Sequence, residues 1–250
     1  MKQLIKNFLR HSGIHFYTDA SLPTGIHWLH DVARSGIVNV QPVLLDVGAN
    51  VGQTVAEMRR AFPRGRIHAF EPFAAPRARL IESVRGDSAV TVVPKAMGSA
   101  PGQVQVRPHT DTQQSSLAVP AAVNDGVQLQ NIEVGTVDDH CDAHGIGHID
   151  VLKTDTEGYD LEVLRGASRR LAAGRVAFVL AEVGFIDSDR QHTSFDAVRS
   201  LLDGHGLRLV GLYETYPLHH FPDPVMFCNA LFVNGGLRDR AARRLRGEAC

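Results

Sequence analysis

The sequence is poor in cysteine and has no long apolar run, and both absences exclude large classes of protein. Its 250 residues include 3 cysteines, at positions 141, 228 and 250, and none of them has C-x-x-C spacing. Scattered thiols argue against a disulfide framework or a zinc site and favour a reducing compartment. No stretch reaches the roughly 18 to 20 apolar residues that span a bilayer, and the start of the chain lacks the continuous apolar core of a signal peptide. We therefore expect a cytoplasmic protein without stable membrane insertion.

A strong net charge is also lacking. The formal charge is -1 at pH 7, with 21% charged and 44% hydrophobic residues, as in an ordinary soluble globular domain. Because so weak a charge gives no general attraction to a phosphate backbone, we expect no nucleic-acid partner. A homo-oligomer is possible. The length suits one α/β domain. We place it at residues 41–235, after a helical or cap segment at 1–40 and before a basic tail at 236–250.

A glycine turn between a strand and a helix is the most informative feature of the chain. The apolar run 43–47 is followed by Gly48 and Gly52, and residues 53–61 have helical character. A second apolar run, 66–70, ends in Glu71, about 20 residues beyond the first strand, where an acidic side chain can take a ribose hydroxyl pair. This pattern predicts a site for an adenosine cofactor.

The spacing of the turn, D-x-G-x-x-x-G, distinguishes between cofactors. Asn50 stands where a dinucleotide-binding turn has its middle glycine, so pyrophosphate is disfavoured. The carboxylate of Asp46 would repel pyrophosphate but suits the ammonium and sulfonium groups of S-adenosylmethionine. An NAD-linked oxidoreductase or epimerase, a cofactor-binding scaffold without catalysis, and a glycine turn without ligand are the alternatives.

Alternating strand and helix signals continue along the chain. Apolar runs at 89–93, 149–154 and 176–183 alternate with helical periodicity at 159–171 and 194–204, which predicts a doubly wound, mostly parallel α/β sheet. Short alternating runs in 102–137 indicate a small β insertion or lid. Two further runs, 207–213 and 225–233, predict a C-terminal antiparallel hairpin.

Several sequence blocks together resemble the FkbM-type methyltransferase family. They are LPTG at 22–25, DVGANVGQ at 46–53, FEP at 70–72, SSL at 115–117, TVDD at 136–139, IDVLKTDTEGYDLEVLRGA at 149–167 and NALFVN at 229–234. The resemblance implies a seven-stranded, Rossmann-like class I fold that uses S-adenosylmethionine, and methyl transfer to a hydroxyl of a saccharide or natural-product small molecule. Asn229 departs from an expected Asp, and Thr154 and Thr156 stand where apolar residues are more usual.

These motifs nominate two groups of site residues. The predicted cofactor contacts are Asp46, Gly48, Asn50, Gly52, Glu71, Pro72, Ala96, Ser116 and Asp155. A sugar hydroxyl needs a base or a Lewis acid before it attacks a methyl group. Asp155 and Glu182 follow strands whose carboxyl ends share one edge of the sheet, so both are candidate catalytic groups. Asp155 and Glu182, with Asn229, could hold Mg²⁺ or Mn²⁺. Alternatively, Asp155 only caps the helix expected at 159–171.

Histidines are the other candidates. His219 and His220 lie in a loop between the last two strands, and one could be the base, or both could lie on the surface. We expect the loops 110–119 and 213–221 to close the acceptor pocket. Residues 113–116 would then contact the cofactor or a polyol, or form a polar lid without ligand. His140, His144 and His148 recur every four residues, but Gly145 and Gly147 interrupt the helix that a metal site there would need.

Overall fold

The computed structural model describes residues 22–106, 129–189, 191–220 and 222–246. Ser116, Cys250 and the SSL block lie outside the described residues, as does the whole loop at 110–119. Among the helices that are described, none combines the length and the apolarity needed to cross a membrane.

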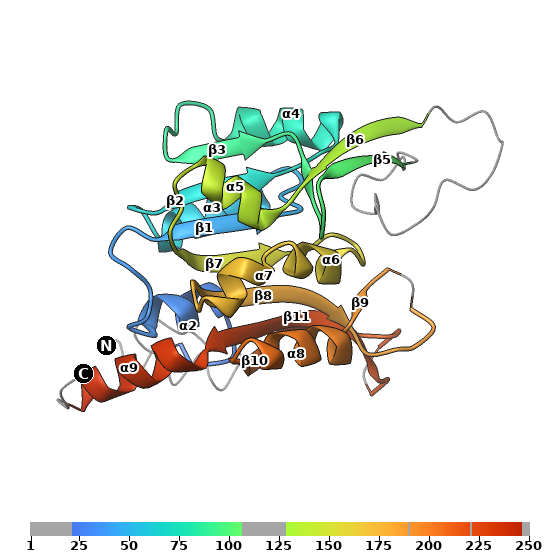
Figure 1. The fold of residues 1–250 in the computed structure, drawn as a ribbon. Coiled ribbons are helices and arrows are strands. Elements are labelled where there is room, and N and C mark those ends of the chain that lie inside the picture. Colours follow the sequence, from blue (N-terminus) through green and yellow to red (C-terminus); the bar gives the residue numbers. More distant parts are fainter. Residues whose placement is uncertain (1–21, 107–128, 190, 221, 247–250) are drawn as a thin grey trace, which may run out of the picture.

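A mixed sheet forms the centre of the molecule (Figure 1), with its main path in the order β10-β11-β8-β7-β1-β2-β3. Five of these strands run parallel: β1 (Val43–Val47), β2 (Arg66–Phe70), β3 (Val90–Val93), β7 (Ile149–Thr154) and β8 (Val176–Gly184). β11 (Val225–Asn234) is antiparallel to both β8 and β10 (Leu207–Pro217), and the short β9 (Thr193–Ser194) pairs with β8. The predicted doubly wound sheet with a terminal hairpin is therefore confirmed.

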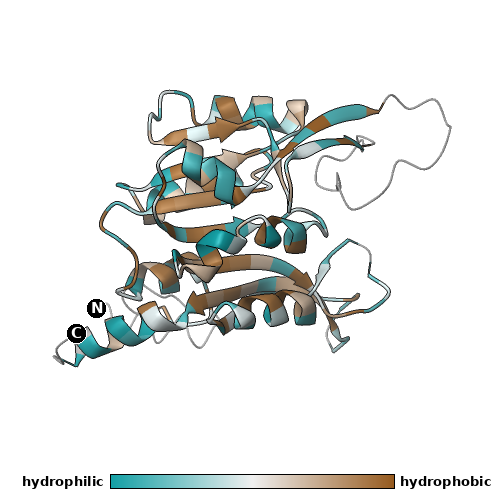
Figure 2. Ribbon diagram, viewed as in Figure 1, coloured by the Kyte–Doolittle hydropathy of each residue, from teal (hydrophilic) through white to brown (hydrophobic). Residues whose placement is uncertain are grey.

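Helices cover both faces of the sheet, which explains why its strands are apolar on both sides. On β1, Val43, Leu45 and Val47 pack into one hydrophobic cluster and Leu44 into the other, as the alternation of side chains along a strand requires. Side chains of α5 (Val137–Ala143), α6 (Asp160–Arg165), α7 (Ser168–Ala172) and α8 (Phe195–Gly204) join the first cluster. Those of α2 (Trp28–Arg34), α3 (Gln53–Ala61), α4 (Ala74–Ser83) and α9 (Gly235–Leu245) join the second. Figure 2 shows the central strands as mainly hydrophobic.

The predicted β insertion forms a separate small sheet in the order β4-β6-β5. It consists of β4 (Ala96–Met97), β5 (Gly102–Val106) and β6 (Gln130–Gly135). In Figure 1, β5 and β6 project beyond the carboxyl ends of the parallel strands. The insertion therefore reaches the edge of the sheet at which open α/β folds bind their ligands.

The single helix expected at 159–171 is wrong, because the segment forms the two short helices α6 and α7. Gly166 lies between them, and a Cβ atom built on it would be 2.0 Å from the carbonyl oxygen of Gly98. Helical periodicity alone does not reveal that the chain must bend here to let two backbones approach.

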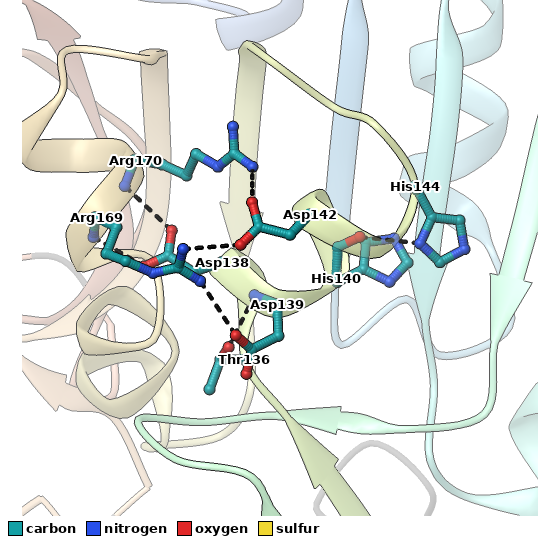
Figure 3. Close-up of polar contacts among 8 residues, drawn as sticks. All are labelled: Thr136, Asp138, Asp139, His140, Asp142, His144, Arg169 and Arg170. Atoms are coloured by element: carbon teal, nitrogen blue, oxygen red, sulfur yellow. Dashed lines mark hydrogen bonds and ion pairs between the residues drawn. The ribbon is translucent and has the colours of Figure 1, made fainter.

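The TVDD segment holds α5 against α7 (Figure 3). The side chain of Thr136 caps α5 by accepting the N–H of Asp139, and the buried carboxylate of Asp138 accepts the backbone N–H groups of Arg169 and Arg170. Both guanidinium groups also pair with Asp142. These contacts satisfy the N–H groups at the start of α7, so we assign this block a structural role.

The histidine series does not form one face of a helix. α5 ends at Ala143, and His148 lies near Asp150 instead. The ring of His140 stacks on His144, and its Nε2 forms a 3.1 Å hydrogen bond with Nδ1 of His68 on β2. Burial lowers the pKa of His68 to about 4 and that of His140 to about 3, so both rings are neutral at pH 7.

Candidate active site

A cavity of about 440 Å³ opens at the carboxyl ends of β1, β2, β7 and β8. This volume lies within the usual range for sites that hold small molecules. Most of the predicted residues line it, namely Gly48, Asn50, Glu71, Pro72, Ala96, Asp155, Glu182 and Asn229, together with Lys153, Glu157, Tyr216 and Phe227. The sequence therefore located the cavity, although several of its residues have roles that differ from those expected.

Two glycines shape the turn after β1 for reasons of packing. Both have positive φ, 84° at Gly48 and 96° at Gly52. A Cβ atom on Gly48 would lie 1.8 Å from the carbonyl oxygen of Asp155, and one on Gly52 would lie 2.7 Å from the Leu80 side chain. Gly48 thus allows the turn to pass close to the end of β7. Gly52 does not line the cavity, and the absence of a Cβ atom there lets α3 and α4 pack closely. Its expected contact with the cofactor stays a prediction.

Glu71 and Asn50 lie together in the wall of the cavity. The carboxylate of Glu71 is 4% exposed and accepts the backbone N–H groups of Asn50 at 3.0 Å and Phe73 at 2.8 Å. Asn50 has a φ of 47°, which brings its N–H group to the carboxylate. Burial raises the pKa of Glu71 to about 7, although the two N–H groups oppose this shift. The carboxylate is therefore fixed in place, and hydroxyl donors from a ligand would stabilise its charged form.

Asp46 is buried and acts through Lys153 rather than by touching a ligand. Asp46 and Lys153 are register partners on β1 and β7, and the Lys153 ammonium lies 3.2 Å from Asp46 Oδ1 and 3.0 Å from Asp155 Oδ2. The expected direct contact between Asp46 and the cofactor is thus wrong: its side chain is 0% exposed. Burial raises the pKa of Asp46, whereas Lys153 opposes that shift.

Asp155 lies in the cavity and caps no helix. Its carboxylate binds Lys153, whereas the residue at the N-cap of α6 is Tyr159, which makes no side-chain capping bond. The capping alternative for Asp155 is therefore wrong. The nearby Asp160 is buried, and its carboxylate accepts the hydroxyl of Thr193 at 3.3 Å. Burial raises the pKa of Asp160 to about 6, and the hydroxyls of Thr154 and Thr156 lower it in part.

Glu182 lies among other acidic side chains at the end of β8. Burial raises its pKa to about 9, and the charges of Asp155, Asp160 and Glu157 add to the effect while Lys153 opposes it. Asn229 on β11 is its register partner, so the two side chains share one face of the sheet. The amide nitrogen of Asn229 donates to Glu214 at 2.6 Å.

His192 and Asp189 were not predicted. His192 Nδ1 lies 2.7 Å from Asp189 Oδ2, and its Nε2 faces Glu182. The imidazole stacks on Phe227, which in turn stacks on Tyr216 across the β10–β11 pair. Neither residue belongs to a motif. The pairing of β9 with β8 brings this segment beside Glu182, which lines the cavity, although His192 and Asp189 themselves line a neighbouring pocket.

The predicted histidine base does not reach this cavity. His219 and His220 are exposed and do not line it. The expectation that Tyr213 helps to close the pocket is also wrong, because its ring is buried and its hydroxyl donates to Asp31 of α2 at 2.8 Å. The strand β10 runs through Pro217, so it is Tyr216, not the histidine pair, that lies at the cavity.

Comparisons with known proteins are consistent with these features. The family model described as "Methyltransferase FkbM domain" matches residues 46–209. The curated protein 2-O-methyltransferase NoeI of Sinorhizobium fredii (strain NBRC 101917 / NGR234) is 22% identical over 169 residues, which are 62% of this chain and 70% of that protein. Among solved structures, an rRNA methylase from Streptococcus thermophilus gives a TM-score of 0.49 at 12% identity, covering 85% of this chain and 98% of its own. The METTL16 MTase domain gives 0.49 at 13%, covering 93% and 78%.

The chain's own residues fit S-adenosylmethionine. The buried carboxylate of Glu71 suits ribose hydroxyls, and the acidic side chains of the cavity suit a cationic ligand. Asn50 lines the cavity beside Glu71. This chain belongs to the FkbM methyltransferase domain family and is an S-adenosylmethionine-dependent methyltransferase.

Proposed function

We propose that this protein transfers a methyl group to a hydroxyl of a saccharide or natural-product small molecule. The observation that carries the proposal is the division of one cavity into two ends. Glu71 and Asn50 form an end suited to a ribose, and Asp155, Glu157 and Glu182 form an acidic end beside it. NoeI, a 2-O-methyltransferase by name, supports transfer to oxygen.

The acidic end argues against a nucleic acid as the acceptor. Asp155, Glu157, Glu182 and Glu214 all line the cavity, and Lys153 is already paired with Asp46 and Asp155. Clustered carboxylates repel a phosphate backbone, whereas they accept hydrogen bonds from the hydroxyls of a polyol. The stacked rings of Tyr216 and Phe227 add an apolar surface on the same cavity.

Two tasks fall to the protein in this reaction: to align the acceptor and to remove its proton. The bound cofactor supplies a methyl group whose carbon–sulfur bond breaks with the electron pair left on sulfur. Asp155, held by Lys153, is placed to accept a proton from the acceptor hydroxyl. Glu182, whose pKa is about 9, keeps its own proton at pH 7. It can accept the proton of the hydroxyl only when a nearby cation lowers that pKa.

Labelled S-adenosylmethionine added to an extract of the native host tests the proposal. We expect the label to appear in a small molecule as a methyl ether. The Asp155→Asn variant should still bind S-adenosylhomocysteine but should lose about 10²- to 10⁴-fold in transfer rate. Label in nucleic acid or protein would refute the acceptor class. Cofactor binding without transfer to any acceptor would support a scaffold, and binding of NAD alone would support an oxidoreductase.

A further inference from the structure

Glu157 follows β7, Glu182 lies near the end of β8, and His192 precedes β9, and each offers one ligand atom within 4.8 Å of the other two. The two glutamates line the cavity, and His192 approaches them from a neighbouring pocket. His192 Nε2 lies 3.8 Å from Glu182 Oε2, too far for a hydrogen bond. Two atoms that are each bound to one metal ion at about 2.0 to 2.2 Å lie at such a separation.

Asp189 sets the orientation of the imidazole. Its carboxylate lies 2.7 Å from His192 Nδ1, and the two side chains are only 4% and 7% exposed. The Nδ1–H group donates to this carboxylate, so the lone pair of Nε2 faces Glu182. Phe227 fixes the plane of the ring by stacking at 4.1 Å with an angle of 10°. A carboxylate behind a histidine is the usual arrangement around metal-binding imidazoles.

Negative charge is in excess around these atoms. Asp155, Glu157 and Asp160 all act on Glu182, and their charges oppose its ionisation. Among the described residues, Lys153 is a cation that acts on Glu182, but its ammonium already contacts Asp46 and Asp155. A divalent ion between Glu157, Glu182 and His192 would offset this excess.

We propose that Glu157, Glu182 and His192 bind one divalent transition-metal ion, for which Mn²⁺ is the appropriate probe. An imidazole ligand disfavours Mg²⁺, which takes oxygen ligands and waters, whereas Mn²⁺ accepts both nitrogen and carboxylate ligands. This set replaces the predicted set of Asp155, Glu182 and Asn229. The ammonium 3.0 Å from Asp155 Oδ2 makes that carboxylate a poor metal ligand.

The function of the ion rests on the proposed methyl transfer, but its binding does not. At this end of the cavity, the ion would coordinate the acceptor oxygen and lower the pKa of its hydroxyl. The proton would pass to Asp155 or to water, and the oxygen would then form the new bond to carbon. Metal binding and methyl transfer can therefore be tested separately.

Binding of Mn²⁺ to the full chain, freed of metal with a chelator, tests the site. Loss of the free Mn²⁺ signal in electron spin resonance should show one bound ion, and the spin-echo spectrum should show coupling to an imidazole nitrogen. His192→Gln and Glu182→Gln should each weaken binding by about tenfold or more, and Asp189→Asn, which disturbs the orientation of the imidazole, by about tenfold. His205→Ala, on a histidine outside the cavity, is the matched control.

Parallel titrations separate this proposal from the previous one. S-adenosylhomocysteine should bind the wild type and all four variants, which also shows that each is folded. Absence of Mn²⁺ binding by a wild type that binds S-adenosylhomocysteine would overturn the metal site and leave the methyltransferase intact. Equal binding in His192→Gln, or preference for Mg²⁺ over Mn²⁺, would overturn the assignment as well. Tighter Zn²⁺ than Mn²⁺ binding that depends on the same residues is the usual order of affinities and would support the site.

Discussion

Replacing Glu71 with alanine should weaken the binding of S-adenosylhomocysteine by roughly 13- to 160-fold. Hydrogen bonds to a charged group contribute about 1.5 to 3 kcal/mol, and each 1.4 kcal/mol is tenfold in affinity. The structure supports a loss of this size, because backbone N–H groups of Asn50 and Phe73 already hold the carboxylate in place. A ligand therefore gains its bonds without the cost of ordering the side chain.

The pH dependence of binding should identify the same carboxylate. With a pKa of about 7, Glu71 is roughly 10% ionised at pH 6 and roughly 90% at pH 8 without ligand. The ribose hydroxyls donate to the ionised form, so affinity should rise about ninefold between these values. In Glu71→Ala this rise should disappear.

Calorimetry with 5′-methylthioadenosine isolates the contribution of Glu71 to the pH dependence of binding. This ligand keeps the ribose but lacks the amino-acid group, whose own titration would add to the pH profile. Glu82→Ala removes an exposed carboxylate on α4 and is the control, for which we expect unchanged affinity. Equal affinity of wild type and Glu71→Ala for both ligands would refute the assignment of Glu71 to the ribose. A pH profile that survives in Glu71→Ala would refute its role as the titrating group.

Three further predictions concern stability. His140→Gln should make thermal unfolding less sensitive to acid between pH 7 and 5. In the wild type the native ring stays neutral while the unfolded ring binds a proton near pH 6.5, so the stability of the wild type decreases as the pH is lowered. An unchanged slope would contradict this. Asp138→Ala should lower the free energy of unfolding by about 1 to 2 kcal/mol in urea, since two N–H groups of α7 lose their acceptor; Asp139→Ala, at an exposed neighbour, should cost less. Gly48→Ala should cost roughly 3 kcal/mol or more and abolish cofactor binding, because its Cβ meets Asp155.

The strands of the sheet were predicted well because each strand is recognised from the residues within it. A strand buried on both faces favours a near-continuous apolar run, and 176–181 is such a run within β8, in the stretch where the sequence predicts a strand. The break between α6 and α7 was not predictable in this way. It depends on the approach of Gly166 to Gly98, which are 68 positions apart, and periodicity within one helix contains no signal of that contact.

At the cavity, the same distinction between local and distant contacts separates the residues that the sequence placed there from those that it missed. Glu71 was identified by its fixed spacing from a glycine turn, because a ribose-binding carboxylate must follow the neighbouring strand. Gly48 was also identified from the motif. Its φ of 84° and its missing Cβ atom let the turn approach the backbone that follows β7, whether or not a ligand is bound. A glycine in a motif thus indicates close approach of the backbone without naming the partner.

His192 shows why the acceptor end was harder to predict than the cofactor end. The proposed cofactor end uses residues that directly follow β1 and β2, whereas His192 lies in the loop between β8 and α8 and comes beside Glu182 of the cavity. Its orientation depends on Asp189, three positions earlier, and on Phe227, which lies on another strand. The histidine pair at 219 and 220 attracted attention because it stands beside aromatic and proline residues, but sequence proximity does not place a side chain. A candidate base or metal ligand in such a loop is recognised only by what holds its ring, and here a buried carboxylate holds His192 while both predicted histidines are exposed.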